Sequence, residues 1–254
     1  MTPFANSQIF KNMLTLKVKA RLNTEILKSE NTLSVRDQMW RLYNRYYQVE
    51  PASFFARFAG NDYYALYKKG DRLIGFTALR LKEIKTPYGK FMTFYVGQSI
   101  IDKNFRNRSL IPQTCVKVVA KNFALNPFQP LLVWCDSLTY KPYLAFAKAT
   151  TEYYPTYKKQ TPDYIKAVRD ELGKHYYGEN YDPATGTVAK DKVIVDDPST
   201  AISEKDLQNP DIRFFTEANK NYRQGHGLIT IVPANAKNFA YCFKRCLKKQ
   251  LNIK

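Results

Sequence analysis

The chain has 254 residues, of which 44% are hydrophobic and 15% aromatic, a composition that suits a globular protein and excludes a disordered one. Its 40 Lys and Arg residues outnumber its 22 Asp and Glu residues, and the formal charge of +18 favours anionic partners such as nucleic acid, acidic lipid, a cofactor's phosphates or an acidic carrier protein. No apolar run reaches transmembrane length and no secretory signal is visible, so a soluble cytoplasmic protein is expected.

Cysteine and histidine usage argues against disulfides and metal sites. The four cysteines, Cys115, Cys135, Cys242 and Cys246, lie in apolar or helical segments of a chain long enough to fold without bridges. Cys242 and Cys246 are one helical turn apart, but the chain has only two histidines to complete a zinc site. We therefore expect buried free thiols and no metal.

The first elements are an arm and two helices. Residues 1–33 are predicted to form an N-terminal arm, whose apolar spacing fits an amphipathic helix or a strand. Ser34, with Asp37 three residues on, predicts the N-cap of a helix over 34–46. After a proline, a second short helix is predicted over 52–58.

Three strand signals follow the helices. Residues 62–68 and 72–84 are predicted strands joined by a Lys-Gly-Asp hairpin turn at 69–71. Thr-Pro-Tyr-Gly at 86–89 predicts a second turn before a strand over 90–101. Together the three strands are expected to form an antiparallel meander.

After the meander, helices and strands alternate. The polar and basic residues 102–108 precede a predicted helix over 109–125. Residues 130–136 are apolar on both faces, which predicts a strand in the interior of the sheet, and a helix over 141–153 follows. A helix between two strands favours a right-handed parallel crossover.

Residues 158–225 carry weaker signals and are interpreted as an insertion or a lid. A Thr-Pro pair predicts the start of a helix over 161–173. A short strand is predicted over 192–195 and a helix over 211–221. The segment between them is rich in turn residues.

The last residues are predicted to complete the core. Residues 226–254 should give a strand over 227–232 and a closing helix over 236–251, which join the core formed by residues 34–157. The expected fold class is therefore α/β, in the α+β sense: a mixed, mostly antiparallel central sheet flanked by helices, with a C-terminal insertion.

The order of these elements resembles the GNAT superfamily of acyltransferases. The resemblance covers residues 34–157 and is carried by residues 95–120, YVGQSIIDKNFRNRSLIPQTCVKVVA. Family members bind a pyrophosphate at Arg/Gln-x-x-Gly-x-Gly/Ala in this loop; here Arg106 matches, whereas Ser109 and Ile111 replace the small residues. Small residues let backbone N–H groups approach the phosphates, and Ser109 and Ile111 are bulkier than these. The chain therefore resembles a divergent, acyltransferase-like member of the superfamily.

The resemblance implies transfer of an acyl group from a thioester to an amine. The donor would be acyl-CoA or acetyl-CoA, or the phosphopantetheine of an acyl carrier protein. A strand bulge would polarise the thioester carbonyl, loop arginines would hold phosphate, and a tyrosine and a carboxylate would move protons. The implied donor-binding residues are Gln98, Ser99, Ile100, Arg106, Asn107, Arg108 and Ser109. The implied catalytic residues are Tyr140, Tyr143 and Asp136, with Asp102 as a second candidate base.

Two alternatives stay open from the sequence. The altered phosphate loop also fits a non-catalytic GNAT fold that binds a partner. The charge fits a basic nucleic-acid-binding module, although no helix-turn-helix, RRM, KH or zinc-finger signature is present. The acyl chain, the acceptor and the oligomeric state are open as well.

Overall fold

The structure is a computed structural model that describes residues 22–190, 193–194 and 201–250, apart from the side chains of 193–194 and 249–250. Most of the predicted N-terminal arm, residues 1–21, lies outside the described residues, as does the end of the closing helix. The rest of the arm forms strand β1 (Leu22–Lys28) and the 3-10 turn η1 (Ser29–Val35).

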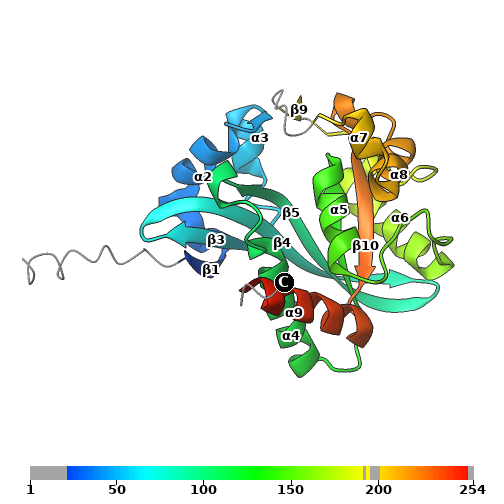
Figure 1. Ribbon diagram of the computed structural model, residues 1–254. Helices are drawn as coiled ribbons and strands as arrows, with labels where there is room; N and C mark the ends of the chain where they lie inside the picture. Colours follow the sequence, from blue (N-terminus) through cyan, green and yellow to red (C-terminus); the bar gives the residue numbers. More distant parts are fainter. Residues whose placement is uncertain (1–21, 191–192, 195–200, 251–254) are drawn as a thin grey trace, which may run out of the picture.

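An eight-stranded sheet runs through the molecule in the order β1-β3-β4-β5-β6-β10-β8-β7 (Figure 1). All neighbouring pairs are antiparallel except β5 and β6, which are parallel. The meander, the parallel crossover and the fold class predicted from the sequence are confirmed. The strands are β3 (Tyr63–Lys69), β4 (Arg72–Thr86), β5 (Gly89–Ile101), β6 (Leu131–Ser137), β7 (Tyr181–Asp182), β8 (Thr187–Val188) and β10 (Gly227–Pro233).

The centre of the sheet is covered on both faces. Every residue of β6 and of β10 is buried, as the apolar runs in their sequences predict. Successive side chains of a strand point to opposite faces, so Val133 packs in one core cluster and its neighbours Leu132 and Trp134 in another.

Four helices lie on one face of the sheet. Buried residues of α4, α5 and α8, together with Phe239 of α9, share one core cluster with Phe94, Val96 and Val133 of the central strands. The helix–strand–helix order after the meander places α4 and α5 on the same face of the sheet, and both contact α9. The bounds are α4 (Leu110–Leu125), α5 (Tyr140–Ala149), α8 (Pro210–Ala218) and α9 (Ala236–Gln250).

Two groups of helices cover the opposite face. Helices α2 (Arg36–Tyr43) and α3 (Pro51–Ala56) pack on β3, β4 and the end of β5. Helix α6 (Asp163–Tyr177) packs on β6 and β10 through residues such as Val168. Residues 158–225 thus contribute two packed helices, α6 and α8, and two sheet strands. The remaining elements are η2 (Lys103–Phe105), η3 (Gly178–Asn180), η4 (Tyr222–Gln224), α7 (Glu204–Leu207) and the pair β2 (Tyr47–Gln48) and β9 (Val193–Ile194).

The predicted N-cap at Ser34 is wrong. Ser34 lies inside η1, and α2 begins at Arg36 after Val35, which makes no side-chain capping bond. The Arg36 guanidinium donates from Nε to Thr32 Oγ1 (3.2 Å) and from Nη2 to Ser29 O (3.1 Å). These bonds tie the 3-10 turn to the first residue of the helix, whose N-cap position is Val35, one residue later than predicted.

Two predicted helices end earlier than expected. The helix predicted over 34–46 ends at Tyr43, because the chain then enters the short strand β2. The helix predicted over 141–153 ends at Ala149. There Thr150 adopts an extended backbone, and both its amide N (3.1 Å) and its Oγ1 (2.9 Å) donate to Phe146 O, which closes the last turn.

Candidate functional site

The two central strands separate part of the way along their length. Strands β5 and β6 are paired only from Met92–Leu131 to Tyr95–Trp134. Beyond that point β5 continues to Ile101 and β6 to Ser137 without pairing to each other. The sheet is therefore open between the second halves of these strands.

A β-bulge lies at this opening. Phe76 pairs with Ile100 and Ala78 pairs with Gly97, so two residues of β5, Gln98 and Ser99, face the single residue of β4 between them. Gln98 has a left-handed backbone (φ +47°). A bulge removes the extra residue from the hydrogen-bond ladder and changes the direction of the strand, so backbone groups here are available to a ligand.

A cavity of about 380 Å³ occupies the opening. Its apolar walls include Val96, Val133, Cys115, Phe146 and Phe239, from β5, β6, α4, α5 and α9. Tyr46 and Tyr47 also line it, and they follow α2 on the opposite face of the sheet. The cavity, called the inner cavity below, therefore passes between the strands from one face to the other.

Gln98 brings a buried, unpaired hydrogen-bond donor to the inner cavity. The residue is 9% exposed, and its Oε1 lies 3.3 Å from Tyr64 Oη and 3.4 Å from Asn61 Nδ2, which fixes the carboxamide. Its Nε2 is buried and has no hydrogen-bond partner. A buried donor without a partner costs about 1–3 kcal/mol, so this amide is suited to a ligand carbonyl.

Asp136 supplies the carboxylate of the inner cavity, whose lining also includes Arg106 and Lys141. It lies near the end of β6 and is buried, and its carboxylate accepts hydrogen bonds from the hydroxyls of Tyr95 (3.0 Å to Oδ1) and Tyr177. The Lys190 ammonium forms an ion pair with Oδ2. Burial, together with the Asp136 carboxylate, raises the pKa of both tyrosines, so the phenols stay protonated and donate to Asp136 throughout the neutral range.

Cation–ring and ring–ring contacts hold the Tyr95 ring, whose hydroxyl donates to Asp136. The Arg80 guanidinium lies between the rings of Tyr95 (3.9 Å) and Tyr176 (4.1 Å). Trp134 packs against Tyr95 with ring centroids 4.6 Å apart. A Cβ at Gly97 would fall on the Tyr95 ring, so only glycine fits there. The orientation of Asp136 is therefore set by groups from β4, β5, β6 and α6.

The cysteines around the inner cavity are not activated. All four cysteines are free thiols. Burial raises the pKa of Cys115 to about 12 and raises that of Cys135 further, while a hydrogen bond to Cys246 and burial raise that of Cys242. Because the thiolate is the nucleophile, these side chains are poor candidates for a covalent intermediate.

A second cavity of about 500 Å³, called the outer cavity, adjoins the first. It lies between the loop before α4, the start of α5 and the end of α9. Its lining includes five cationic residues and no Asp or Glu. These residues are Arg106, Arg108, Lys141, Lys148 and Arg245. Such a site attracts a phosphate or another anion.

Backbone strain marks both cavities. Among the described residues, three non-glycine residues have positive φ: Gln98, Asn107 (+66°) and Ser109 (+56°). Gln98 lines the inner cavity, and the other two line the outer one. Such conformations cost energy and cluster at functional sites. Ser109 takes the N-cap position of α4 but makes no capping bond, because capping side chains need an extended backbone there.

The basic loop is anchored by Asp102. This buried carboxylate pairs with Arg72 (2.9 Å) and accepts from the Asn104 amide (3.0 Å). Arg106 Nε donates to Ile101 O (3.2 Å). Asp102 lines neither cavity and serves the loop conformation, so Asp136 is the better candidate base of the two.

The structure separates the two candidate tyrosines. Tyr140, the first residue of α5, lines the outer cavity. Tyr143 is fully buried among the rings of Tyr153, Phe214 and Phe215, and lines neither cavity. Its hydroxyl donates to Pro155 O (3.0 Å). Of the two, only Tyr140 lies on a surface that a ligand reaches.

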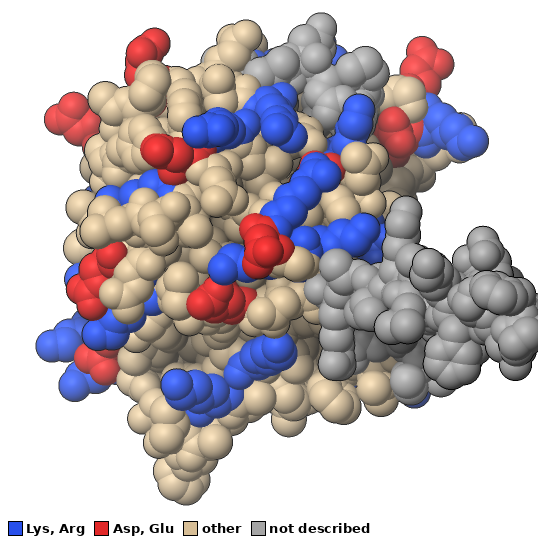
Figure 2. All heavy atoms as spheres, turned by 90° about the vertical axis from the view of Figure 1, so that its left-hand side faces the viewer, with Lys and Arg blue, Asp and Glu red and all other residues tan. Residues whose placement is uncertain are grey.

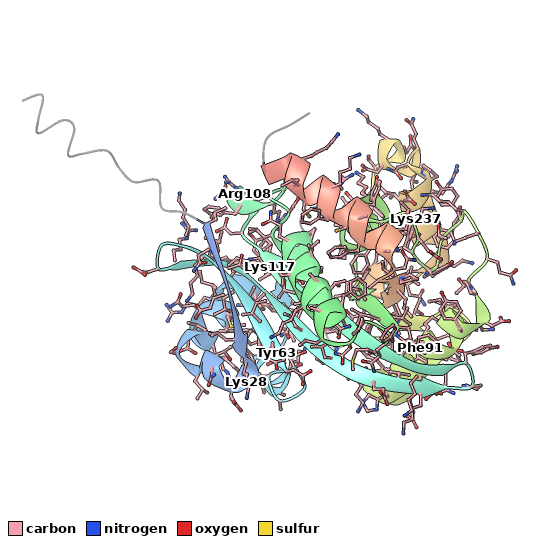
Figure 3. The ribbon with its side chains drawn as sticks, turned by 90° about the horizontal axis from the view of Figure 1, so that it is seen from below. Lys28, Tyr63, Phe91, Arg108, Lys117 and Lys237 are labelled. Carbon is pink, nitrogen blue, oxygen red and sulfur yellow. The ribbon has the colours of Figure 1, made fainter. Side chains whose placement is uncertain are left out.

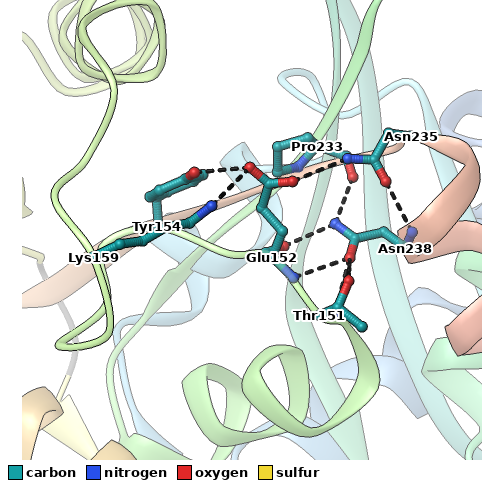
Figure 4. Close-up of polar contacts among 7 residues, drawn as sticks. All are labelled: Thr151, Glu152, Tyr154, Lys159, Pro233, Asn235 and Asn238. Atoms are coloured by element: carbon teal, nitrogen blue, oxygen red, sulfur yellow. Dashed lines mark hydrogen bonds and ion pairs between the residues drawn. The ribbon is translucent and has the colours of Figure 1, made fainter.

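Helix α9 is part of the site, which the sequence does not indicate. Figure 4 shows how its first turn is held: Asn238 Nδ2 donates to Glu152 O and Pro233 O (both 2.8 Å). Its Oδ1 accepts from the amides of Thr151 (2.9 Å) and Glu152 (3.0 Å). Asn238 is 2% exposed and lines the inner cavity. One side chain thus joins α9 to the ends of α5 and β10.

Replacing Asn238→Ala should lower the free energy of unfolding by about 3 kcal/mol, because four hydrogen bonds between this buried side chain and the backbone are lost. Urea unfolding followed by circular dichroism measures the loss. Asn235→Ala is the matched control: its Oδ1 accepts only from the Asn238 amide (2.8 Å), and about 1 kcal/mol is expected. Equal losses for both variants would contradict this role of Asn238.

Comparisons with known proteins return acetyltransferases of solved structure. One is an aminoglycoside acetyltransferase from an uncultured soil metagenomic sample in complex with trehalose, 16% identical over 56% of this chain and 92% of its own, with a TM-score of 0.38. The glucosamine-6-phosphate N-acetyltransferase from Arabidopsis thaliana is 10% identical over 56% of this chain and 99% of its own, with a TM-score of 0.38.

A third is the ribosomal-protein-alanine N-acetyltransferase from Brucella melitensis biovar Abortus 2308, 10% identical over 56% of this chain and 98% of its own, with a TM-score of 0.38. No protein-family model and no curated relative matches the chain. The element order on which the GNAT resemblance rests is present in the structure.

Within residues 22–190, 193–194 and 201–250, no helix is long and apolar enough to cross a bilayer. Over the same described part of the chain, no group of three His, Cys, Asp or Glu side chains is arranged to hold a metal ion.

Proposed function

We propose that this protein is an N-acyltransferase that moves an acyl group from an acyl thioester to an amine. The observation that carries the proposal is a continuous path: a cationic outer cavity, an apolar inner cavity between the separated strands, and Asp136 with Gln98 at its polar end. A phosphopantetheine thioester has the matching order of an anion, a long neutral arm and a carbonyl.

The donor arm fits the apolar part of the path. The phosphate would lie against Arg106 and Arg108, where a guanidinium bound to phosphate forms a charge-assisted hydrogen bond. Ser109 and Ile111 make the loop bulkier than in GNAT relatives, and Ile111 lines both cavities. This difference favours a donor that contacts the loop through one phosphate group rather than through a closely held pyrophosphate.

The chemistry needs few groups of the protein. Gln98 Nε2 and the backbone of the bulge would donate to the thioester oxygen as it becomes negative. Asp136 would accept the proton of the attacking amine as its N–C bond forms and the C–S bond breaks. The leaving thiolate takes a proton from solvent, because Tyr140 lines the outer cavity, where the phosphate would lie.

The donor is CoA-bound or bound to an acidic carrier protein. Lys141, Lys148 and Arg245, which line the outer cavity, support either donor, because CoA and the carrier protein's phosphopantetheine both bring phosphate to this cavity. A carrier protein would also be steered by the basic surface, and its association rate would fall steeply with salt.

The test is release of free thiol from acetyl-CoA, long-chain acyl-CoA and acyl carrier protein with a panel of primary amines. Arg106→Ala should raise the KM for the donor about 10- to 100-fold, since a charged hydrogen bond is lost. Arg41→Ala on α2 is the control and should leave KM unchanged. Donor binding without thiol release for any amine would make the chain a non-catalytic binding protein, and no donor binding would overturn the proposal.

A further inference from the structure

The net positive charge of the chain is concentrated in two sequence segments, because acidic residues are nearly absent from them. Residues 103–151 and 218–254 hold 15 of the 40 Lys and Arg residues but one of the 22 Asp and Glu residues, the buried Asp136. These segments contain α4, α5 and α9. By contrast, acidic and basic side chains are mixed on the side of the molecule that Figure 2 shows.

Helices α4 and α9 form one outward face. They pack side by side, as seen from below in Figure 3, and the rings of Phe123 and Phe239 meet at 5.7 Å. We call the exposed residues of this pair and of the loop after α4 the α4–α9 face. Its lysines are Lys117, Lys121, Lys237, Lys244 and Lys248, all exposed.

The α4–α9 face also exposes large apolar side chains. Phe128, in the loop after α4, is 96% exposed, and Leu125 at the end of α4 is 68% exposed. On α9, Phe243 and Leu247 are 50% and 43% exposed and lie one helical turn apart. Water contact of so much apolar surface is unfavourable, and apolar side chains between lysines are typical of an interaction surface.

We propose that the α4–α9 face docks on an anionic lipid bilayer. The lysines match acidic headgroups, and the apolar side chains enter the interface between headgroups and acyl chains. A bilayer suits this face because Phe128 and Leu125 project from the end of a helix and need no complementary groove. Arg245 of α9 lines the outer cavity, so docking places the opening of that cavity close to the headgroups.

The test is co-sedimentation of the full chain with vesicles of phosphatidylcholine alone and of phosphatidylcholine with phosphatidylglycerol. Binding is expected only to the anionic vesicles and should weaken with salt. Lys117→Glu with Lys244→Glu should weaken it at least about tenfold. Phe128→Ser with Leu125→Ser should weaken it about tenfold, because the inserted apolar area is lost.

Matched controls lie away from the α4–α9 face. Leu33→Ser, at a residue 71% exposed in η1, and Lys28→Glu in β1 should leave vesicle binding unchanged. Circular dichroism melting checks that each variant is folded. Equal binding to neutral vesicles, no binding at low salt, or equal losses in the controls would overturn the proposal. Capture of acyl carrier protein by this face without lipid binding would assign it to a protein partner instead. Vesicle binding does not depend on acyl transfer, so the two proposals fail separately.

Discussion

Asp136→Asn is expected to slow acyl transfer by about 10²–10⁴-fold, because the amine loses the group that takes its proton. The KM for the donor should stay close to that of the wild type, since phosphate binding lies in the outer cavity. Steady-state thiol release at saturating donor and acceptor measures the effect. A kcat within threefold of the wild type, a margin of about 0.7 kcal/mol, would contradict the role of Asp136.

The same substitution also affects stability. Asp136 and Lys190 form an ion pair with side chains 6% and 10% exposed. Removing one partner leaves a buried, uncompensated charge, which costs about 3–5 kcal/mol. The double variant Asp136→Asn with Lys190→Met removes both charges and should recover most of this loss. If activity returns with stability, Asp136 is structural; if activity stays low in a stable double variant, Asp136 is the base.

Ala145→Trp should abolish donor binding. Ala145 lies on α5 where the inner and outer cavities meet, and it lines both. An indole there would block the path of the donor arm. At a donor concentration of about 100 Kd, the wild type gains about 2.7 kcal/mol of stability, whereas the variant should gain none.

Thermal melting with and without donor measures this difference. Ala124→Trp is the matched control: it places the same ring at an exposed position of α4 that lines neither cavity, and the donor should still raise its Tm. A full donor-induced shift in Ala145→Trp would mean that the donor binds elsewhere.

The sheet could be predicted from the sequence because its signals are local. The Lys-Gly-Asp and Thr-Pro-Tyr-Gly turns fix the meander, and the apolar run of β6 fixes its buried position. The end of a helix depends on finer contacts. Arg36 moves the start of α2, and the Thr150 hydroxyl ends α5, through hydrogen bonds that no propensity indicates.

The sequence indicated candidate site residues on the strands, on the basic loop and, with Tyr140, at the start of α5. Gln98, Arg106 and Asp136 line the inner cavity, because the element order places their segments beyond the paired part of β5 and β6. Lys190 and Asp136 are 54 positions apart in the sequence. Asn238 is 87 positions from Thr151 and 86 from Glu152. Only the tertiary fold brings such groups together. Tyr143 was predicted as a catalytic residue, but its position on α5 points its side chain into the core.

Hydrogen exchange of the wild-type chain with and without a non-hydrolysable acyl-phosphopantetheine analogue, the part that both candidate donors share, tests the central claim most directly. Exchange should slow at the amides of residues 97–101 and 106–111, which line the opening between the strands and the loop before α4. The amides of α2 and α3 should be unaffected. No protection, or protection confined to other segments, would contradict a donor site between β5 and β6.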